Sequence, residues 1–325
     1  MDFKQQYQRH KELIDRYLTD AVVESKPRSL YKPLTYVLAG GGKRIRPILV
    51  LLASEAVGGK AEGAVHAGVG IEILHNFTLV HDDIMDNADS RRGRATVHTK
   101  WDDNVAILVG DELLALAYRI LLRTESPRIK EIASVFTEGV VEVCEGQAYD
   151  KEFENRSNVN VDEYLLMIRK KTGKMVAVAT EIGAIIGNGS PAETTALKKY
   201  GELVGRAFQV QDDLLDVVGD EKQFGKMIGG DLREGKKTFL LLEALKRARG
   251  KDKLLLKGLV KNGGASKKMI GEFRRIFHAS GAIGAAESRI RSDIDEAKHQ
   301  LALLKSSPAK EMLFWFTDML LHRTY

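Results

Sequence analysis

Apolar residues recur at helical spacing along most of the chain, and this pattern predicts a succession of long helices. The clearest segments are Ile48–Val57, Ala64–Asp86, Val105–Leu122, Ile129–Tyr149, Val161–Ile186, Glu193–Val218 and Thr238–Arg249. The breaks between them are short and rich in Gly, Asn, Ser or charged residues, and no segment alternates in the manner of a strand. We therefore predict an all-α fold, with residues 1–325 forming the helical bundle of a single domain.

One break, Gly-Asn-Gly-Ser-Pro-Ala at residues 187–192, matches a loose dinucleotide-binding fingerprint, but no strand precedes it. A helix boundary explains these residues better, because Ser190 can cap a helix that starts at Pro191, and Glu193 can complete a capping box. The Gly-Gly-Gly-Lys-Arg stretch that ends at Arg44 is not a P-loop either, since Ser or Thr should stand at that position.

Composition narrows the function only slightly. The 50 basic and 45 acidic residues leave a net charge of +5, which is mild for 325 residues and does not favour a nucleic-acid-binding protein. A single cysteine, Cys144, excludes an intrachain disulfide and fits the reducing cytoplasm, where we expect the protein. The N-terminal segment is polar, and the most apolar stretches are too short or carry charge, so we expect no signal peptide and no membrane anchor.

The first segment that suggests chemistry is His81-Asp-Asp-Ile-Met-Asp86, at the end of an almost wholly apolar predicted helix. Asp82 and Asp86 are four residues apart, so they lie on one face of a helix, with Asp83 beside them. Carboxylates gathered at the end of an apolar helix repel each other and lose solvation, and a bound divalent cation would remove that cost. A solvated helix end explains this segment equally well when it is taken alone.

A second segment, Phe208–Asp216, repeats the Asp-Asp-x-x-Asp spacing and shifts the balance toward metal binding. Its carboxylates are Asp212, Asp213 and Asp216. If the two segments face each other, they could hold several Mg²⁺ ions around a diphosphate, because Mg²⁺ often takes only one or two carboxylates per ion and completes its shell with phosphate oxygens.

Basic residues accompany both acidic segments. Arg91-Arg-Gly-Arg94 follows the first, Gly235-Lys-Lys-Thr238 follows the second, and Gly42–Pro47 opens an earlier helix. Arg forks match phosphate geometry and Lys supplies point charge, although salt bridges to the nearby aspartates are the simpler reading of each segment alone. Taken together, the segments predict a site for two diphosphates, with one bridged by metal and the other held by bases. We find no Ser-His-Asp order and no zinc-type Cys/His spacing, so the chemistry should rely on metal and electrostatics.

These motifs resemble those of the trans-isoprenyl diphosphate synthase (polyprenyl synthetase) family, in the family's order. They are GGGKRIRP (Gly40–Pro47), LVHDDIMD (Leu79–Asp86), RRGRATVH (Arg91–His98), KTG (Lys171–Gly173), FQVQDDLLD (Phe208–Asp216) and GKMIGGDLREGKKT (Gly225–Thr238). The resemblance implies a short-chain, Mg²⁺-dependent prenyl transferase that joins isopentenyl diphosphate to allylic diphosphates, such as dimethylallyl, geranyl and farnesyl. It also implies a helical bundle around a central apolar cavity, and a homodimer.

The resemblance implies roles for single residues as well. The diphosphate of isopentenyl diphosphate would be bound by Lys43, Arg46, His75 and Arg92. That of the allylic substrate would be bound by Arg91, Lys171, Lys226 and Lys236. The main Mg²⁺ ligands would be Asp82, Asp86 and Asp212, supported by Asp83, Asp213 and Asp216. Oxygens near the cationic carbon would come from Thr172 and Gln209. His75 would be an ordinary core histidine without the resemblance, and His81 is read as structural.

Product length in this family depends on the bulk just before the first acidic motif. Thr78 and Phe77 stand four and five residues before Asp82, roughly 6–7.5 Å along the helix at about 1.5 Å per residue. A small residue next to an aromatic one resembles archaeal-type C20 synthases, so geranylgeranyl diphosphate is the expected product and farnesyl diphosphate the next candidate. A bulky residue from another helix, such as Tyr118, is an alternative floor.

Two other functions fit parts of the sequence. A terpene cyclase shares the helical cavity and one Asp-Asp-x-x-Asp motif, but it normally adds an NSE-type metal motif that is not found in this chain. A non-catalytic partner subunit usually lacks an aspartate motif or the Lys43/Arg46 pair, and all of these are present.

Overall fold

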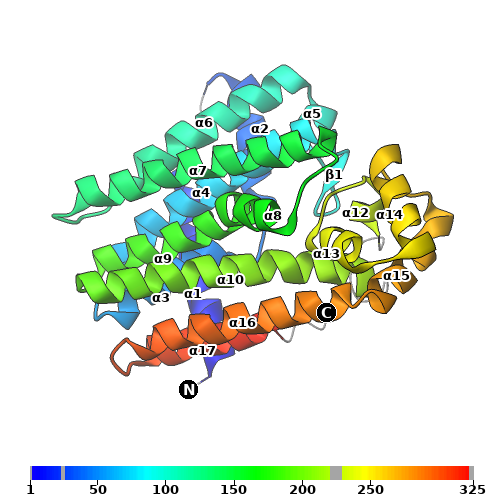
Figure 1. The fold of residues 1–325 in the computed structure, drawn as a ribbon. Coiled ribbons are helices and arrows are strands. Elements are labelled where there is room, and N and C mark those ends of the chain that lie inside the picture. Colours follow the sequence, from blue (N-terminus) through cyan, green and yellow to red (C-terminus); the bar gives the residue numbers. More distant parts are fainter. Residues whose placement is uncertain (1, 23–25, 220–228, 322–325) are drawn as a thin grey trace. The chain divides into compact units, whose positions relative to one another are not determined.

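The computed structural model describes residues 2–22, 26–219 and 229–321, and these residues are largely helical (Figure 1). The helices up to residue 186 are α1 (Phe3–Ala21), α2 (Arg28–Leu38), α3 (Ile45–Ala56), α4 (Ala61–Met85), α5 (Val97–Lys100), α6 (Asp103–Leu121), α7 (Ile129–Asn155), α8 (Val161–Ile168), η1 (Arg169–Gly173) and α9 (Lys174–Ile186). The later ones are α10 (Pro191–Val218), α12 (Gly230–Arg233), α13 (Phe239–Arg247), α14 (Gly250–Asn262), η2 (Lys267–Met269), α15 (Ile270–Ala279), α16 (Ala282–Ala302) and α17 (Pro308–Leu321). The all-α prediction is confirmed.

Most predicted helices agree with the structure to within a few residues at either end, but the predicted segment Val161–Ile186 is not continuous. It consists of α8 and α9 with η1, one turn of π-helix, between them. The predicted capping box before α10 is present. Glu193 Oε2 accepts a hydrogen bond from the Ser190 backbone N–H at 2.9 Å, and the Glu193 N–H donates to Ser190 Oγ at 3.3 Å.

Contacts divide the chain into two compact units. The first contains residues 1–137, 178–198 and 304–313, and the second contains residues 138–177, 199–303 and 314–325. The single-domain assignment from the sequence stays a prediction, as does the central apolar cavity.

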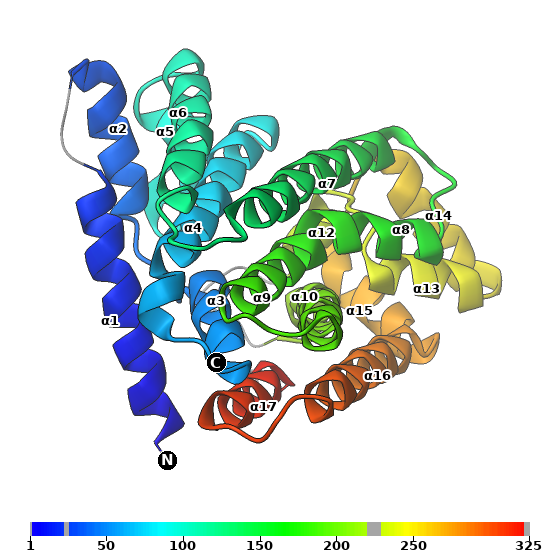
Figure 2. The same ribbon diagram turned by 90° about the vertical axis from the view of Figure 1, so that its left-hand side faces the viewer.

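The core of the first unit is built on α4, which packs between α3 and α6 (Figure 2). A helix that is apolar around its whole circumference must be covered on all sides, and α4 is buried along most of its length. Glycine allows close packing at Gly70, because a Cβ there would lie 3.1 Å from the carbonyl oxygen of Ala117 in α6. The acidic end of α4 is therefore held by a rigid, tightly packed helix.

The second unit has its own core around α13, whose leucines pack with residues of α8, α10, α14, α15 and α16. Phe239, Leu240 and Leu241 are at most 4% exposed. This core supports the C-terminal end of α10, where the second acidic segment lies.

Strand structure among the described residues is limited to a short hairpin, β1 (Ser90–Arg91) and β2 (Arg94–Ala95). Its two turn residues, Arg92 and Gly93, have φ values of 53° and 73°, as a tight type I′ turn requires. None of the helices in the described part of the chain is long and apolar enough to cross a membrane.

Candidate active site

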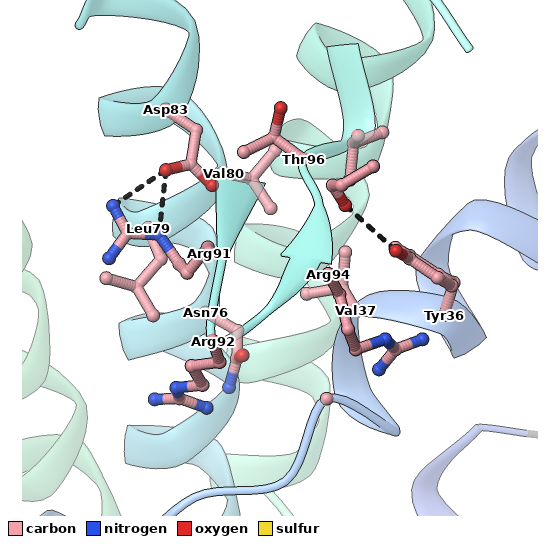
Figure 3. Close-up of a pocket in the computed structure, with 13 residues that line it drawn as sticks. Tyr36, Val37, Asn76, Leu79, Val80, Asp83, Arg91, Arg92, Arg94 and Thr96 are labelled. Atoms are coloured by element: carbon pink, nitrogen blue, oxygen red, sulfur yellow. Dashed lines mark hydrogen bonds and ion pairs between the residues drawn. The ribbon is translucent and has the colours of Figure 1, made fainter. Parts of the chain in front are cut away.

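The first acidic segment lies at the C-terminal end of α4, with its three carboxylates in different environments. Asp83 is buried, Asp82 is half-buried and Asp86 is exposed. Arg91 of the hairpin donates from Nε and Nη2 to Asp83 Oδ1, both at 2.7 Å (Figure 3). Asp83 is thus occupied by an ion pair within the protein, which fits a supporting part better than direct metal ligation.

The hairpin presents three arginines beside this segment, and each has a distinct set of partners. Arg92 Nη1 donates a short hydrogen bond to the carbonyl oxygen of Gly41. The guanidinium of Arg94 stacks 3.9 Å from the ring centroid of Tyr36 in α2. Figure 3 shows these side chains around a cavity of about 60 Å³, a volume that suits a few water molecules.

Two of the four residues assigned to isopentenyl diphosphate, Arg46 and His75, are in direct contact in the first unit. Arg46 Nη1 lies 3.2 Å from His75 Nε2, and the Gly41 carbonyl that Arg92 contacts belongs to the same glycine loop that precedes Arg46. Burial, followed by the charges of Arg46 and Arg92, holds the pKa of His75 well below its usual range. A neutral imidazole beside two guanidinium groups is an environment that an anion would stabilise.

Lys43, the fourth member of this group, is exposed, and its carbonyl oxygen accepts a short hydrogen bond from the Tyr7 hydroxyl of α1. The structure therefore places Lys43, Arg46, His75 and Arg92 in one region of the first unit, around the glycine loop of residues 40–42.

The predicted chain-length residues lie one turn before the first acidic segment. Phe77 is 9% exposed, and its ring meets that of His81 edge to face, with centroids 4.8 Å apart. Thr78 Oγ1 donates to the His75 carbonyl at 2.8 Å. His81 packs on Phe77, and its Nε2 lies 3.4 Å from the Ile107 carbonyl oxygen of α6. Tyr118 instead donates from its hydroxyl to Thr137 Oγ1 at 2.9 Å.

The second acidic segment lies at the C-terminal end of α10, in the second unit. Asp213 is buried and accepts hydrogen bonds from the Tyr164 hydroxyl, from Gln209 Nε2 at 3.1 Å and from the Phe239 N–H at 3.3 Å. Asp216 accepts from the backbone N–H groups of Gly230 and Asp231, both at 3.1 Å.

Burial raises the pKa of Asp213 and of Asp216, against the hydrogen bonds that each accepts, and the charge of Asp212 adds to the rise at both. Buried carboxylates that lie close together repel one another when they are ionised, and a bound cation would reduce this repulsion.

Asp231, a residue without a predicted role, joins this cluster. Burial raises its pKa, and the charges of Asp213 and Asp216 raise it further. The available signal was its place within the Gly225–Thr238 motif, between Lys226 and Lys236. Lys236 Nζ lies 2.8 Å from Glu234 and 4.0 Å from Asp231, so this assigned base reaches the rim of the same cluster. The assigned Lys226 lies outside the described residues.

The π-turn η1 positions the two predicted site residues that follow α8. Lys171 Nζ forms an ion pair with Asp150 of α7 at 2.6 Å, and Thr172 Oγ1 donates to Gln209 Oε1 at 3.0 Å. The structure thus brings Thr172 and Gln209 into direct contact, and Gln209 in turn bonds Asp213. Asp150, the partner of Lys171, was missed because an ion pair between distant segments leaves no periodic signal in the sequence.

The carboxylates of the two acidic segments are the candidate ligands for a metal ion. Among residues 2–22, 26–219 and 229–321, no three His, Cys, Asp or Glu side chains are gathered in a metal-binding group. Each acidic segment nevertheless offers carboxylates at half-exposed positions, Asp82 in one and Asp212 and Asp216 in the other. All these donors are hard oxygens, so the set fits Mg²⁺ held by one or two carboxylates and by the phosphate oxygens of a substrate.

Comparison with known proteins decides the family. Residues 27–277 match the family model described as Polyprenyl synthetase. This chain belongs to the polyprenyl synthetase family. It is 40% identical over 318 residues to the short chain isoprenyl diphosphate synthase of Methanothermobacter thermautotrophicus, covering 98% of this chain and 97% of that protein.

Two further polyprenyl synthetase relatives carry more specific names. The geranylgeranyl diphosphate synthase of Methanosarcina mazei is 37% identical over 96% of this chain and 95% of its own length. The crystal structure of geranylgeranyl pyrophosphate synthetase from Pyrococcus horikoshii superposes with a TM-score of 0.94 at 37% identity, covering 99% of this chain and 100% of that one. The match with the polyprenyl synthetase model begins after α1, although Tyr7 of that helix donates a hydrogen bond to the carbonyl oxygen of Lys43.

Proposed function

We propose that this polyprenyl synthetase is a short-chain prenyl transferase that condenses isopentenyl diphosphate with allylic diphosphates. Its main product is geranylgeranyl diphosphate, and farnesyl diphosphate is the second candidate. The observation that carries the proposal is the similarity, over almost the whole chain, to proteins named short chain isoprenyl and geranylgeranyl diphosphate synthases. The two acidic segments with their bases supply the groups that such a reaction needs.

The diphosphate of isopentenyl diphosphate is assigned to the basic group of the first unit, which consists of Lys43, Arg46, His75 and Arg92. The proximity of Arg46 to His75 and the link from Arg92 to the glycine loop support this assignment. Arg forks suit the paired oxygens of a phosphate, and a bound dianion would offset the mutual repulsion of the cations.

The allylic diphosphate is assigned to Arg91, Lys171, Lys226 and Lys236, together with Mg²⁺. The proposed metal ligands are Asp82, Asp86 and Asp212, with Asp83, Asp213 and Asp216 in support. Asp83, Asp213 and Asp216 each accept hydrogen bonds from protein donors, which fits the supporting part assigned to them. Bound Mg²⁺ would stabilise the negative charge that collects on the leaving diphosphate.

The chemistry is a substitution through an allylic cation. The allylic C–O bond breaks, and the diphosphate leaves with the electron pair toward Lys171 and the other bases. The double bond of isopentenyl diphosphate then supplies the electrons of the new C–C bond. A proton is lost from the adjacent carbon to the departed diphosphate, which restores a double bond. Oxygens of Thr172 and Gln209 stabilise the cation, and apolar walls exclude water from it.

The proposed ruler for product length is Phe77, with the small Thr78 beside it. Each cycle adds five carbons, and the growing chain stops when its end meets the bulk of the Phe77 ring. Replacing Phe77 with Ser should therefore lengthen the product beyond C20. An unchanged product from this variant would discard Phe77 as the floor and direct attention to Tyr118.

The test is an incubation of the purified protein with Mg²⁺, radiolabelled isopentenyl diphosphate and one allylic starter of five, ten or fifteen carbons. Products are dephosphorylated and sized by chromatography. A C20 limit supports the proposal in full. A C15 limit or chains beyond C20 would keep the prenyl transferase and reject the assignment of product length. Absence of elongation with every starter would favour a terpene cyclase or a non-catalytic partner subunit.

The setting of the enzyme is also proposed. We place it in the cytoplasm without a membrane anchor, as a homodimer that acts on small diphosphates and binds no nucleic acid. The mild net charge of +5 and the single cysteine support the cytoplasmic and non-nucleic-acid parts. The homodimer rests on resemblance to the family, and sedimentation of the purified protein tests it.

A further inference from the structure

Arg44 stands between two residues assigned to substrate, Lys43 and Arg46, but its own side chain turns into the protein. The side chain is 5% exposed. Its Nε donates to Asp15 Oδ1 of α1 at 2.8 Å, and its Nη1 donates to Glu72 Oε1 of α4 at 2.6 Å. An arginine committed in this way is not available to a substrate, so another reason is needed for a charged group at this position.

The backbone of Arg44 points to that reason. Its φ of 52° and ψ of 34° lie in the left-handed region, where a residue with a side chain is strained. Its carbonyl accepts the first hydrogen bond of α3, from the Ile48 N–H at 3.1 Å. The conformation of Arg44 therefore sets where α3 begins and in which direction the backbone of Lys43 approaches the helix. A fork of two charged hydrogen bonds can hold a strained residue in place.

The glycine loop before Arg44 needs such support. Gly41 and Gly42 have φ values of 70° and 153°. Because glycine has no side chain, this part of the backbone is free to adopt many other conformations. Arg44 Nη1 lies 3.4 Å from the Gly41 carbonyl oxygen, the same atom that accepts a hydrogen bond from Arg92. One guanidinium thus links the loop to both α1 and α4.

Helix α1 holds the loop from the other side. Tyr7, Lys11 and Asp15 are spaced four residues apart and share one face of α1. The Tyr7 hydroxyl donates to the carbonyl oxygen of Lys43, and Lys11 forms an ion pair with Asp15 at 2.8 Å. Burial, and then the charges of Glu72 and Asp15, raise the pKa of Tyr7 to about 12, so its hydroxyl remains a donor at neutral pH.

We propose that Arg44 is a positioning residue for the isopentenyl diphosphate site, and that Tyr7 and Asp15 make helix α1 a support of that site. This inference rests on the proposed function. Arg44 does not touch the substrate. It fixes the spacing between Lys43 before it and Arg46 after it. Glu72, which accepts a hydrogen bond from Arg44, lies on α4, the helix that also contains His75. A lysine would not replace Arg44, because a single ammonium lacks the planar fork that reaches two carboxylates.

The test measures KM for the two substrates separately in variants of the anchor. Asp15→Asn and Tyr7→Phe each remove one link from α1 and leave every proposed substrate ligand intact. Asp20→Asn and Tyr17→Phe are matched controls on the same helix. We expect KM for isopentenyl diphosphate to rise about fivefold in the first pair. KM for farnesyl diphosphate should stay within about twofold, and both controls should behave as wild type.

A third variant separates backbone from side chain. Arg44→Gly relieves the strain of a positive φ but removes the fork, so KM for isopentenyl diphosphate should rise about a hundredfold if the fork matters. If this variant does not fold, the two α1 variants still decide the question. Unchanged KM in Asp15→Asn and Tyr7→Phe would overturn the inference, as would an equal rise for both substrates with a lowered melting temperature. A wild-type protein that forms no prenyl product would instead overturn the proposed function.

Discussion

Helix α7 meets the π-turn η1 at Gly146, and the contact leaves no room for a side chain. A Cβ at this position would lie 2.3 Å from the backbone N of Lys171 and 2.7 Å from its Cα. It would also lie 2.8 Å from the carbonyl carbon of Lys170. All three atoms belong to the backbone, so no side chain can rotate away to make space. The substitution Gly146→Ala must move the π-turn itself.

The size of the effect follows from these distances. Ordinary contacts of a Cβ begin at 3.4 Å, so α7 and the π-turn must separate by about 1 Å. Overpacking of this kind costs about 1–3 kcal/mol in the free energy of unfolding. The displaced residues are Lys171 and Thr172, which are assigned to the leaving diphosphate and to the cation. A misplacement of about 1 Å at a reacting centre can lower turnover about a hundredfold.

The assay combines denaturant unfolding with turnover at saturating substrates. Gly258→Ala in α14 is the matched control, because a Cβ there would meet no atom within 4 Å. Alanine is the better helix former, so the control should stabilise the protein by about 0.5–1 kcal/mol and leave turnover unchanged. The two substitutions are chemically the same, and the structure predicts effects of opposite sign on stability.

The reasoning would be refuted by a Gly146→Ala variant with wild-type turnover, even if it were less stable. That result would mean that the position of the π-turn does not set the rate. A loss of turnover equal in both alanine variants would refute it as well, since the control leaves η1 in place.

Two further predictions concern His81 and His75, both on α4. A Cβ at Gly110 would lie 2.0 Å from His81 Nε2, so the imidazole must move, and Gly110→Ala should lower the free energy of unfolding by about 1 kcal/mol in a denaturant titration, less than Gly146→Ala. Adding His81→Ala should recover part of that loss, and a Gly110→Ala variant as stable as wild type would contradict the packing. His75 has a depressed pKa in the folded protein, so below about pH 6.5 its imidazole binds a proton in the unfolded chain and not in the folded one. The free energy of unfolding therefore decreases as the pH is lowered through this range. The unfolding free energy of wild type should therefore drop about 1.4 kcal/mol more than that of His75→Gln between pH 7.5 and 5.5, whereas equal drops would place the ring in solvent.

Hydrophobic periodicity predicts much of this fold because most helices carry a continuous apolar surface. Helix α4 is an example, since its long apolar run up to the first acidic segment is explained by a helix that is buried on all sides. The capping box at Ser190 is local, so its residues alone predict where α10 begins. The acidic and basic segments can also be recognised in the sequence, because each is a short run of charged residues that the burial of an apolar helix does not explain.

Several features that escaped prediction depend on contacts between distant segments. The π-turn between α8 and α9 interrupts a sequence whose periodicity looks continuous, and its close neighbour Gly146 lies on another helix. The ion pair of Lys171 with Asp150 and the fork from Arg44 to Asp15 and Glu72 join residues far apart in the chain. No spacing rule connects such residues, so the sequence shows the charges but not their partners.

A magnesium titration of prenyl transfer tests most directly whether both acidic segments serve one reaction. The purified protein is given radiolabelled isopentenyl diphosphate and farnesyl diphosphate, stripped of metal with a chelator and then supplied with increasing Mg²⁺. Wild type should be inactive without metal and should recover with Mg²⁺.

Asp82→Asn and Asp212→Asn should each lower kcat about 100-fold to 1,000-fold and require more Mg²⁺, because each removes a negative ligand from the proposed metal site. The control Asp111→Asn, at an exposed position of α6, should titrate as wild type does. Wild-type rates and magnesium dependence in either of the first two variants would contradict the assignment of that acidic segment to the reaction.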